Sequence, residues 1–474
     1  MEVVLGIDLG TSYFKLALVD RAGTLRGLGR VFVPKDEGDG TRCELPVERF
    51  WNLLREGLSQ ACREGGVQPS DICAVAYSSQ ANSFLLLDAS DEPLTPLVLW
   101  PDHRDTPVAP SIRELFQRDD FLLTTGLGID AGPGLCVSKL AWFRKHQPNI
   151  WSRTRRVMTI SDYLSFALTG RTVGDMGTAA LMAVLDLKGH RWWEEALGAL
   201  KLSRSLLSDV LVPGTVAGVV QGDVAQSMGL RPGIPFAVGS LDHHVASTGV
   251  GHIAQMSEST GTVLACLHST REYRPRPDCC LGPGFGSGEY YELAFNDNGA
   301  VGMEWYQRRF APDHSLPELD SLAESVAPGC DGLIALPEAF KEDGLGGFRH
   351  VTVRHGHGHF IRALMESTAF SLSRLVGHLR GDDLPARIAA TGGGARSSVW
   401  LQIKADVLGV EVVTALCREP ACLGAGMLAA MAAGWFQSLA DAGRSWIAIE
   451  QRFTPDAARS RAYAEWAQQY RQEL

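Results

Sequence analysis

The feature that most constrains the fold is a strand–glycine turn–strand unit that occurs once in each half of the chain. At the N-terminus, the apolar residues 3–7 lead into a turn at 8–12 (DLGTS), and a second apolar run follows at 14–19. In the second half, residues 259–262 (STGT) lead into the apolar run 263–267. Apolar runs joined by short glycine turns are typical of β-hairpins. Because the unit recurs, the sequence predicts a duplicated domain.

Extended and helical patterns alternate along the rest of the chain. The first half predicts a strand near residues 26–33, a helix at 50–62 and short buried strands at 72–77 and 84–87. The second half predicts a helix at 358–379, a strand at 387–390, a helix at 397–408 and a strand at 411–414. This alternation predicts an α/β fold with mixed sheets flanked by helices.

A proline- and glycine-rich stretch at residues 230–235 precedes a new apolar strand at 236–238. The chain has 474 residues, which is long enough for more than one core. We therefore predict two domains, residues 1–236 and 237–474. The more helical segment 121–220 is interpreted as an insertion in the first domain.

Composition excludes several classes of protein. The net charge of −10, without any basic run, argues against a nucleic-acid partner. The longest uncharged apolar stretch in the C-terminal part, residues 423–436, is too short to span a bilayer, and no secretory signal pattern follows Met1. Ten cysteines without a CxxC pair do not form a zinc or disulfide framework. We expect a cytoplasmic protein with neither a nucleic-acid nor a membrane partner.

The glycine turns are the first candidates for chemistry. The chain has no Walker A motif, but turn amides and hydroxyls at residues 10–12 can hold phosphate oxygens. Asp8 beside this turn could orient Mg²⁺, which prefers one or two carboxylates together with phosphates. Taken alone, the motif is better explained as an ordinary hairpin turn.

Two further motifs lie in the second half of the chain. Residues 391–398 (TGGGARSS) let a nucleotide lie against bare backbone, and Ser397 or Ser398 can cap the following helix; a plain strand–helix connection explains them equally well. Asp242 directly follows a buried strand, where it could accept a proton from an attacking hydroxyl. His243 and His244 are interpreted as polar residues at a helix start, and the histidine run 354–359 as a polar loop rather than a metal site.

Taken together and in order, these motifs resemble the FGGY family of carbohydrate kinases, within the actin/hexokinase/Hsp70-like superfamily. The similarity covers nearly the whole chain and rests on an ordered set of matches. These are residues 6–12 (first phosphate motif), 97–104 (W-x-D-x-R), 162–175 (DYL, LTG and an aspartate), 239–242 (G-x-x-D), 259–262 (second phosphate motif), 392–406 (adenosine motif) and 423–426 (LGAG).

The resemblance implies two ribonuclease-H-like domains of the actin-like ATPase type, with a cleft between them. The sugar would lie mainly on the N-terminal domain and ATP mainly on the C-terminal one. Domain closure would exclude water, so that the sugar hydroxyl receives the phosphoryl group. By the same resemblance Asp242 is the general base and Asp8 helps to hold Mg²⁺. The nucleotide contacts that it implies are Thr11, Ser12, Gly261 and Thr262 to phosphates, and Gly393, Gly394 and Ala395 to adenosine.

The resemblance also bears on the sugar. After Gln80 this chain has Ala81-Asn82, where glycerol kinases have Arg-Glu and xylulose kinases have Met-His. Ala81 cannot clasp hydroxyls, which disfavours glycerol, whereas Asn82 can donate and accept a hydrogen bond. Asp102 and Arg104 are further sugar-contact candidates, with a structural ion pair as the alternative, and Asp242 would also face the sugar.

We therefore expect an ATP-dependent kinase for a ketopentose such as xylulose. Another ketose, a polyol or an aldonate remains open as the substrate. A catalytically silent sugar-sensing relative is the rival within the family, but Asp8 and Asp242 are both present. A chaperone or filament protein of the superfamily is disfavoured by the W-x-D-x-R and DYL…LTG segments. The oligomeric state is left open, with a homodimer as one option.

Overall fold

The computed structural model describes residues 1–35 and 40–474, which form two compact units. Unit 1 comprises Met1–His252, Ser269–Glu292 and Glu419–Ile447, and unit 2 comprises Ile253–His268, Leu293–Arg418 and Ala448–Leu474. Helices and mixed sheets occur in both, so the predicted α/β class is confirmed. The proposed division at 236/237 falls inside the first segment of unit 1.

The central sheet of unit 1 has six strands in the order β13-β14-β5-β1-β2-β3. Strand β1 pairs antiparallel with β2 and parallel with β5, and β14 also runs parallel to β5. The predicted first hairpin, β1–β2, is therefore present within a mixed sheet, between β5 and β3. The strands are β1 (Val3–Leu9), β2 (Tyr13–Asp20), β3 (Leu25–Phe32), β5 (Ile72–Ser79), β13 (Val216–Val219) and β14 (Pro235–Leu241).

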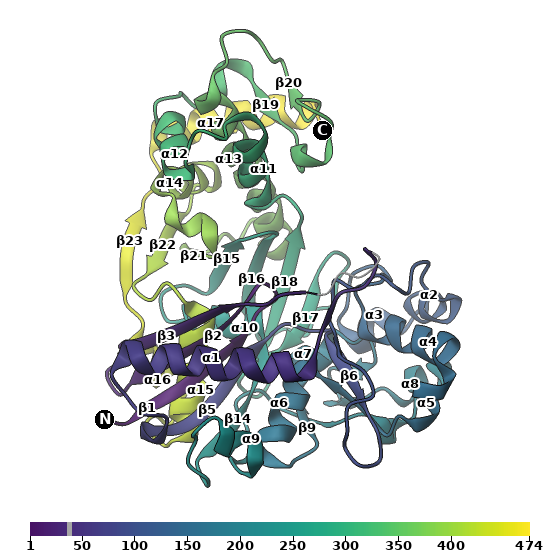
Figure 1. Ribbon diagram of the computed structural model, residues 1–474. Helices are drawn as coiled ribbons and strands as arrows, with labels where there is room; N and C mark the ends of the chain where they lie inside the picture. Colours follow the sequence, from purple (N-terminus) through teal and green to yellow (C-terminus); the bar gives the residue numbers. More distant parts are fainter. Residues whose placement is uncertain (36–39) are drawn as a thin grey trace. The chain divides into compact units, whose positions relative to one another are not determined.

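Helices cover both faces of this sheet. Alternate residues of β1, beginning at Val3, belong to one apolar core with α1 (Val47–Gly65) and α6 (Ile160–Thr169). The opposite face meets α15 (Pro420–Ala432): a Cβ added at Gly6 would lie 2.4 Å from the Cys422 carbonyl oxygen. Figure 1 shows α1 lying along β1, β2 and β3. A late segment of the chain thus completes the core of unit 1.

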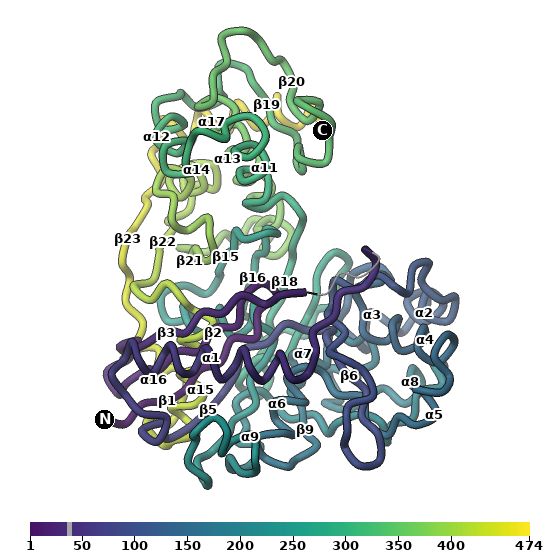
Figure 2. The backbone as a smooth tube through the Cα atoms, in the orientation of Figure 1, coloured from purple at the N-terminus to yellow at the C-terminus, as the bar shows by residue number. Residues whose placement is uncertain are grey.

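Beyond this sheet, unit 1 contains a four-stranded sheet in the order β4-β7-β6-β8 and a largely helical region. The helical region follows the prediction for 121–220, although short strands interrupt it. Figure 2 shows the path of the backbone through this region. The strands of the small sheet are β4 (Glu44–Leu45), β6 (Phe84–Leu87), β7 (Leu97–Val98) and β8 (Arg156–Thr159). The helices are α2 (Pro110–Phe116), α3 (Phe121–Thr125), α4 (Cys136–His146), α5 (Pro148–Arg153), α7 (Met176–Ala180), α8 (Glu194–Leu200), α9 (Gly222–Ser227), α10 (Asp242–Thr248) and α16 (Leu439–Trp446).

The second large sheet has the order β17-β18-β16-β15-β21-β22-β23, and its strands β15, β21, β22 and β23 lie in unit 2. Strand β15 pairs antiparallel with β16 and parallel with β21, which repeats the pattern around β1. The strands are β15 (Met256–Thr260), β16 (Leu264–Thr270), β17 (Cys280–Pro283), β18 (Tyr290–Asn296), β21 (Arg387–Thr391), β22 (Glu411–Ala415) and β23 (Ile449–Phe453). The helices are α11 (Val301–Phe310), α12 (Leu316–Glu324), α13 (His357–Arg380), α14 (Ser398–Leu408) and α17 (Ala457–Gln472).

The histidine run differs in part from its prediction as a polar loop. Helix α13 begins at His357, so only residues 354–356 precede it. The Nδ1 atom of His359 accepts a hydrogen bond from the Gly356 backbone N–H at 3.2 Å, which caps the helix. The helix therefore begins one residue before the predicted start at 358, and the last three residues of the histidine run belong to it.

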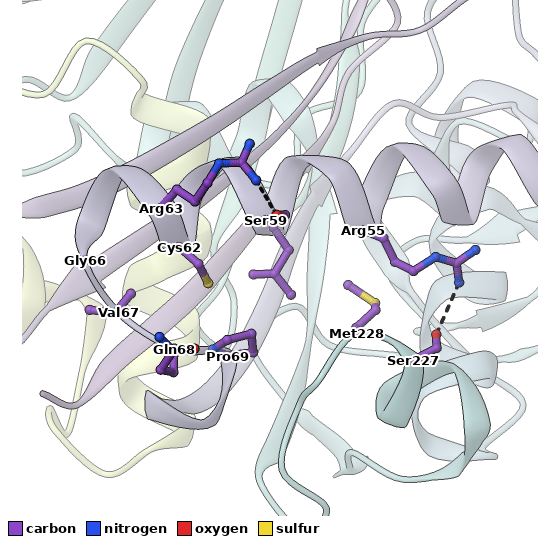
Figure 3. Close-up of a pocket in the computed structure, with 11 residues that line it drawn as sticks. Arg55, Ser59, Cys62, Arg63, Gly66, Val67, Gln68, Pro69, Ser227 and Met228 are labelled. Carbon is purple, nitrogen blue, oxygen red and sulfur yellow. Dashed lines mark hydrogen bonds between the residues drawn. The ribbon is translucent and has the colours of Figure 1, made fainter.

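A surface pocket of about 490 Å³ lies in unit 1, at the C-terminal end of α1 (Figure 3). Arg55 donates a hydrogen bond to Ser227, and Arg63 donates one to Ser59. None of the predicted site residues lines this pocket. Within the described residues, no helix is long and apolar enough to cross a membrane.

Candidate active site

The first glycine turn places a carboxylate and a lysine opposite each other on β1 and β2. Asp8 pairs with Lys15 in the strand register, and the Lys15 Nζ atom lies 3.5 Å from Asp8 Oδ2 and 2.8 Å from Glu419. The Ser78 hydroxyl donates to Asp8 Oδ1 at 2.9 Å. Asp8 is buried, whereas Lys15 retains 23% of its side-chain exposure. The predicted metal-binding carboxylate is therefore held in one orientation.

Electrostatics at this turn involve a second carboxylate. Burial raises the pKa of Asp8, Lys15 opposes that rise, and the charge of Asp242 adds to it. Asp8 and Asp242 are thus close enough to repel each other. Two carboxylates in such a relation are stabilised by a cation, and oxygen ligands are what Mg²⁺ prefers. The donor chemistry fits the magnesium ion that the sequence predicts.

Asp242 is the first residue of α10, directly after β14. Its Oδ1 atom accepts a hydrogen bond from the His243 backbone N–H at 2.8 Å, and its side chain is half-buried. The strand register places Ser78 opposite both Asp8 and Ser240. Asp8 and Asp242 therefore belong to the same edge of the unit 1 sheet, where parallel α/β strands present ligand-binding groups.

His243 and His244 lie at the start of α10, as interpreted, but His244 is buried in the core and not exposed as a polar surface residue. Its ring is buried, stacks on Tyr291 with 4.9 Å between ring centroids, and lies against Gly282. Burial lowers the pKa of His244 to about 3, so the ring is neutral at physiological pH. Within the described residues there is no group of three or more His, Cys, Asp or Glu side chains that could hold a metal.

The predicted sugar-contact residues occupy three different environments. Ala81 is buried. Asn82 has a φ of 62°, and its Oδ1 atom accepts from the Cys136 backbone N–H at 3.0 Å, so its amide group is the part left to donate. Asp102 is fully buried and accepts from Arg104 and from the Cys43 backbone, while Arg104 also pairs with Glu44. The contacts of Asp102 and Arg104 are those of a structural ion pair.

Around this ion pair lie Trp100 of the W-x-D-x-R motif and two residues that sequence reasoning did not single out, Lys139 and Asp105. The Trp100 indole N–H donates to the Thr11 hydroxyl at 2.8 Å, and the buried Lys139 ammonium donates to the Trp100 carbonyl at 3.2 Å. Neither carboxylate oxygen of Asp105 has a hydrogen-bond partner within the described residues, although only 4% of the residue is exposed. Burial raises the pKa of Asp105 to about 6, against the opposing charge of Lys139. In the sequence, the signal for these buried charges was Lys139, which stands among the buried residues of α4.

The second glycine turn, in unit 2, joins β15 to β16. The Gly261 N–H donates to the Val263 carbonyl at 3.0 Å, and the Gly261 carbonyl accepts from Ala300 at 2.7 Å. Thr262 at the tip is exposed. The turn is therefore fixed through its backbone, while the predicted phosphate-binding threonine stays accessible.

The predicted adenosine motif forms a turn that is packed on the end of β15. Gly392 has a φ of 79°, which favours glycine, and Gly393 is exposed. A Cβ at Gly394 would lie 2.8 Å from the Thr260 Cβ, so only glycine permits this approach. Ser397 accepts from the Trp400 N–H at 3.2 Å and caps α14, as predicted. Ala395 is half-buried in the short 3₁₀ turn Gly393–Arg396.

A buried triangle of polar groups lies behind the second turn and was not predicted. Lys404 Nζ lies 2.7 Å from both Glu258 Oε1 and the Thr260 hydroxyl, and that hydroxyl donates to Glu258 Oε2 at 2.7 Å. The side chains of Glu258 and Lys404 are 0% exposed. The signal in the sequence was a glutamate in a strand and a lysine in a helix whose neighbours are apolar.

Known proteins resemble this chain in sequence and in fold. The FGGY family of carbohydrate kinases matches the chain with its N-terminal domain over residues 3–249 and its C-terminal domain over residues 327–433. The xylulose kinase of Lactococcus lactis is 27% identical over 502 residues, covering 99% of this chain and 97% of that protein. The gluconokinase of Bacillus licheniformis is 28% identical over 490 residues, covering 97% and 93%.

A solved structure of a ligand-bound xylulose kinase from Lactobacillus acidophilus has a TM-score of 0.88 at 23% identity, covering 100% of this chain and 97% of that one. This likeness shows the shared fold. The N-terminal family domain alone spans more than half of the chain. This protein therefore belongs to the FGGY family of carbohydrate kinases and is itself a carbohydrate kinase.

Proposed function

We propose that the enzyme transfers the γ-phosphoryl group of MgATP to a hydroxyl of a ketopentose such as xylulose. The observation that carries the proposal is the pair of carboxylates Asp8 and Asp242 at one edge of the unit 1 sheet, close enough that the charge of Asp242 raises the pKa of Asp8. Phosphoryl transfer to an alcohol needs one carboxylate for the proton and another for the cation. Both needs are met by residues of unit 1.

Asp242 takes the role of general base. Its Oδ1 atom accepts a hydrogen bond from the His243 N–H, which orients the carboxylate, and Oδ2 would accept the proton of the sugar hydroxyl. The proton of the attacking hydroxyl passes to this carboxylate as the hydroxyl oxygen bonds to the γ-phosphorus, and the bond from that phosphorus to the bridging oxygen breaks so that ADP leaves. In phosphoryl transfer such a group mainly orients and deprotonates the nucleophile.

Asp8 would take the role of holding Mg²⁺, while its Oδ1 atom accepts the hydrogen bond from the Ser78 hydroxyl. The ion supplies charge neutralisation on the phosphate oxygens. Lys15 sits beside Asp8 and Glu419 and adds a fixed positive charge next to the turn. Its charge opposes the rise in the pKa of Asp8 that burial causes.

The nucleotide contacts remain those implied by the motifs. Thr11 and Ser12 in the first turn, and Gly261 and Thr262 in the second, bind phosphate oxygens. Gly393, Gly394 and Ala395 form the surface for adenosine. The exposed backbone of Gly393 supports a direct contact, whereas Gly394 contributes by allowing the turn to pack on Thr260. ATP use supports the predicted cytoplasmic location.

The choice of sugar rests on Asn82 and on the relatives. Several matched relatives are xylulose kinases, from Lactococcus lactis and Bacillus subtilis among others. The Asn82 amide is free to donate to a sugar oxygen because its Oδ1 atom is used by the Cys136 N–H. A second candidate is an aldonate such as gluconate, favoured by the gluconokinase relatives. Asp102 and Arg104 would shape this side of the site through their ion pair.

The test is ADP release with MgATP across a panel of ketopentoses, ketohexoses, aldonates and polyols. We expect a single strong responder among the ketopentoses. The variant Asp242→Asn should lower kcat by about 10²–10⁴-fold while ATP binding, followed by calorimetry, is retained. Asp209→Asn, at an exposed position of the same unit, is the matched control. Turnover retained in Asp242→Asn would remove the base role, and silence across the panel with ATP bound would favour the sensing relative.

A further inference from the structure

We propose that Glu258, Lys404 and Thr260 are positioning residues that set the nucleotide affinity of the enzyme without touching the nucleotide. They fix the second phosphate turn to the helix that follows the glycine turn. The inference rests on the proposed function, because it assigns these two segments to ATP. It goes beyond that function because it states that a fully buried ion pair sets the affinity for ATP but not the affinity for the sugar.

The three side chains satisfy one another completely. Glu258 Oε1 accepts from Lys404 Nζ, Glu258 Oε2 accepts from the Thr260 hydroxyl, and that hydroxyl accepts from Lys404, each at 2.7 Å. Glu258 and Thr260 are two residues apart on β15, so their side chains share one face of the strand. Ser259 between them points to the other face. A closed triangle of this kind permits only one rotamer of Thr260.

Thr260 connects the buried triangle of side chains to the proposed phosphate-binding turn. It is the last residue of β15 and directly precedes Gly261 of the phosphate turn. Fixing its side chain therefore fixes the direction in which the turn leaves the strand. Lys404 holds the Thr260 side chain in place from α14. The N-terminus of this helix is capped by Ser397 of the adenosine motif.

The glycine turn packs on the same two residues of β15. A Cβ at Gly394 would lie 2.8 Å from Thr260 Cβ, and the Thr391 hydroxyl donates to the Glu258 carbonyl at 2.8 Å. The phosphate turn, the glycine turn and α14 therefore meet at one buried triangle. A change in its charge alters the relative position of the two nucleotide-binding segments.

Stability alone does not account for this arrangement. Burying an ion pair costs desolvation, and a well-packed apolar pair is often as stable or more stable. An apolar pair would fill the same space, but it could not orient the Thr260 hydroxyl. This difference separates a positioning role from a purely structural one.

The first experiment uses Glu258→Gln, which keeps the shape of the side chain and removes its charge. The dissociation constant of ATP is measured by calorimetry in the absence of sugar, together with KM for ATP and for the responding sugar. We expect the ATP dissociation constant to rise about 10-fold or more, while KM for the sugar changes less than about 2-fold. The matched control is Arg452→Met, which removes the exposed Arg452–Glu411 ion pair of the same unit and should leave ATP binding unchanged.

The second experiment replaces the charges by an apolar pair, Glu258→Met with Lys404→Met. We expect the melting temperature of the double variant to equal or exceed that of the wild type. Its affinity for ATP should stay below that of the wild type. Recovery of both stability and ATP affinity would overturn the inference, and so would an unchanged dissociation constant in Glu258→Gln. Failure of the wild type to bind ATP would instead overturn the proposed function, and this inference with it.

Discussion

The two glycine turns have the same backbone plan and different electrostatics. Each turn spans three residues and joins an antiparallel pair, and each first strand has a parallel neighbour on its other side. In the first turn Asp8 faces Lys15 across the hairpin, whereas in the second the equivalent positions hold Ser259 and Ala265. The charges of the second turn are on the opposite face of the strand, at Glu258, and are fully buried.

Under the proposed function, this difference gives the two hairpins different roles. At the first turn, a partly exposed lysine and a buried carboxylate would place charge beside the reacting groups. At the second turn, the buried charges would hold the backbone instead of contacting the ligand.

The largest expected effect concerns the lysines of the two turns. Lys404→Met leaves Glu258 buried without a counter-charge, which should lower the free energy of unfolding by about 3–5 kcal/mol. Lys15→Met, in a pair that retains contact with solvent, should cost about 1 kcal/mol or less. Urea denaturation of both variants and the wild type measures the two costs. Equal costs would mean that the two turns do not differ in the way described.

The next effect separates Asp8 from its structural equivalent, Ser259. Asp8→Asn should lower kcat by about 10²–10³-fold, because a charge that stabilises the transferring phosphoryl group is lost. Ser259→Ala should leave kcat within about 2-fold, since no charge is removed. Steady-state kinetics at saturating MgATP and sugar test both. A loss of similar size in Ser259→Ala would assign the second turn a role in chemistry as well.

The carboxylate of Asp105 differs from that of Glu258, whose two oxygens both accept hydrogen bonds. The two Asp105 oxygens lack hydrogen bonds within the described part of the chain, and Asp105→Asn should raise the free energy of unfolding at pH 7.5 by about 1–3 kcal/mol. The groups that face its charge are Lys139, Asp102 and Arg104.

The pH dependence follows from the raised pKa of Asp105, which is about 6 in the folded protein against an ordinary value of 3.8. The folded state holds this proton more tightly than the unfolded state, so wild-type stability falls between about pH 4 and pH 6 as the group ionises. The advantage of Asp105→Asn should therefore be small at pH 4 and full above pH 6.5. An advantage that is the same at both pH values would contradict this account.

The smallest effect tests a contact that the second turn lacks. Trp100→Phe removes the indole N–H that donates to the Thr11 hydroxyl and keeps an aromatic side chain at this position. Loss of one such hydrogen bond should raise KM for ATP by about 2- to 10-fold. Thr262→Val, at the exposed tip of the second turn, provides the comparison. An unchanged KM in Trp100→Phe would show that the first turn holds its shape without the indole.

Much of the fold could be predicted because its signals are local. The predicted helix at 50–62 lies inside α1, and the predicted strand at 387–390 lies inside β21. Helix ends were less accurate, since α1 extends to a left-handed Gly66 that the apolar pattern does not mark. The W-x-D-x-R motif pointed to Asp102 and Arg104, but the contacts of these two residues could not be derived from spacing.

The sequence by itself determined the two hairpins, the α/β class and the order of the family motifs, because each depends on residues that are close along the chain. Tertiary structure alone decided which groups meet. Lys404 reaches Glu258 across 146 positions, and Asp242 joins unit 1 because β14 pairs with β5. The physical reason is that a buried charge gains its stability from partners supplied by other elements, and no local pattern records which partner folding will bring.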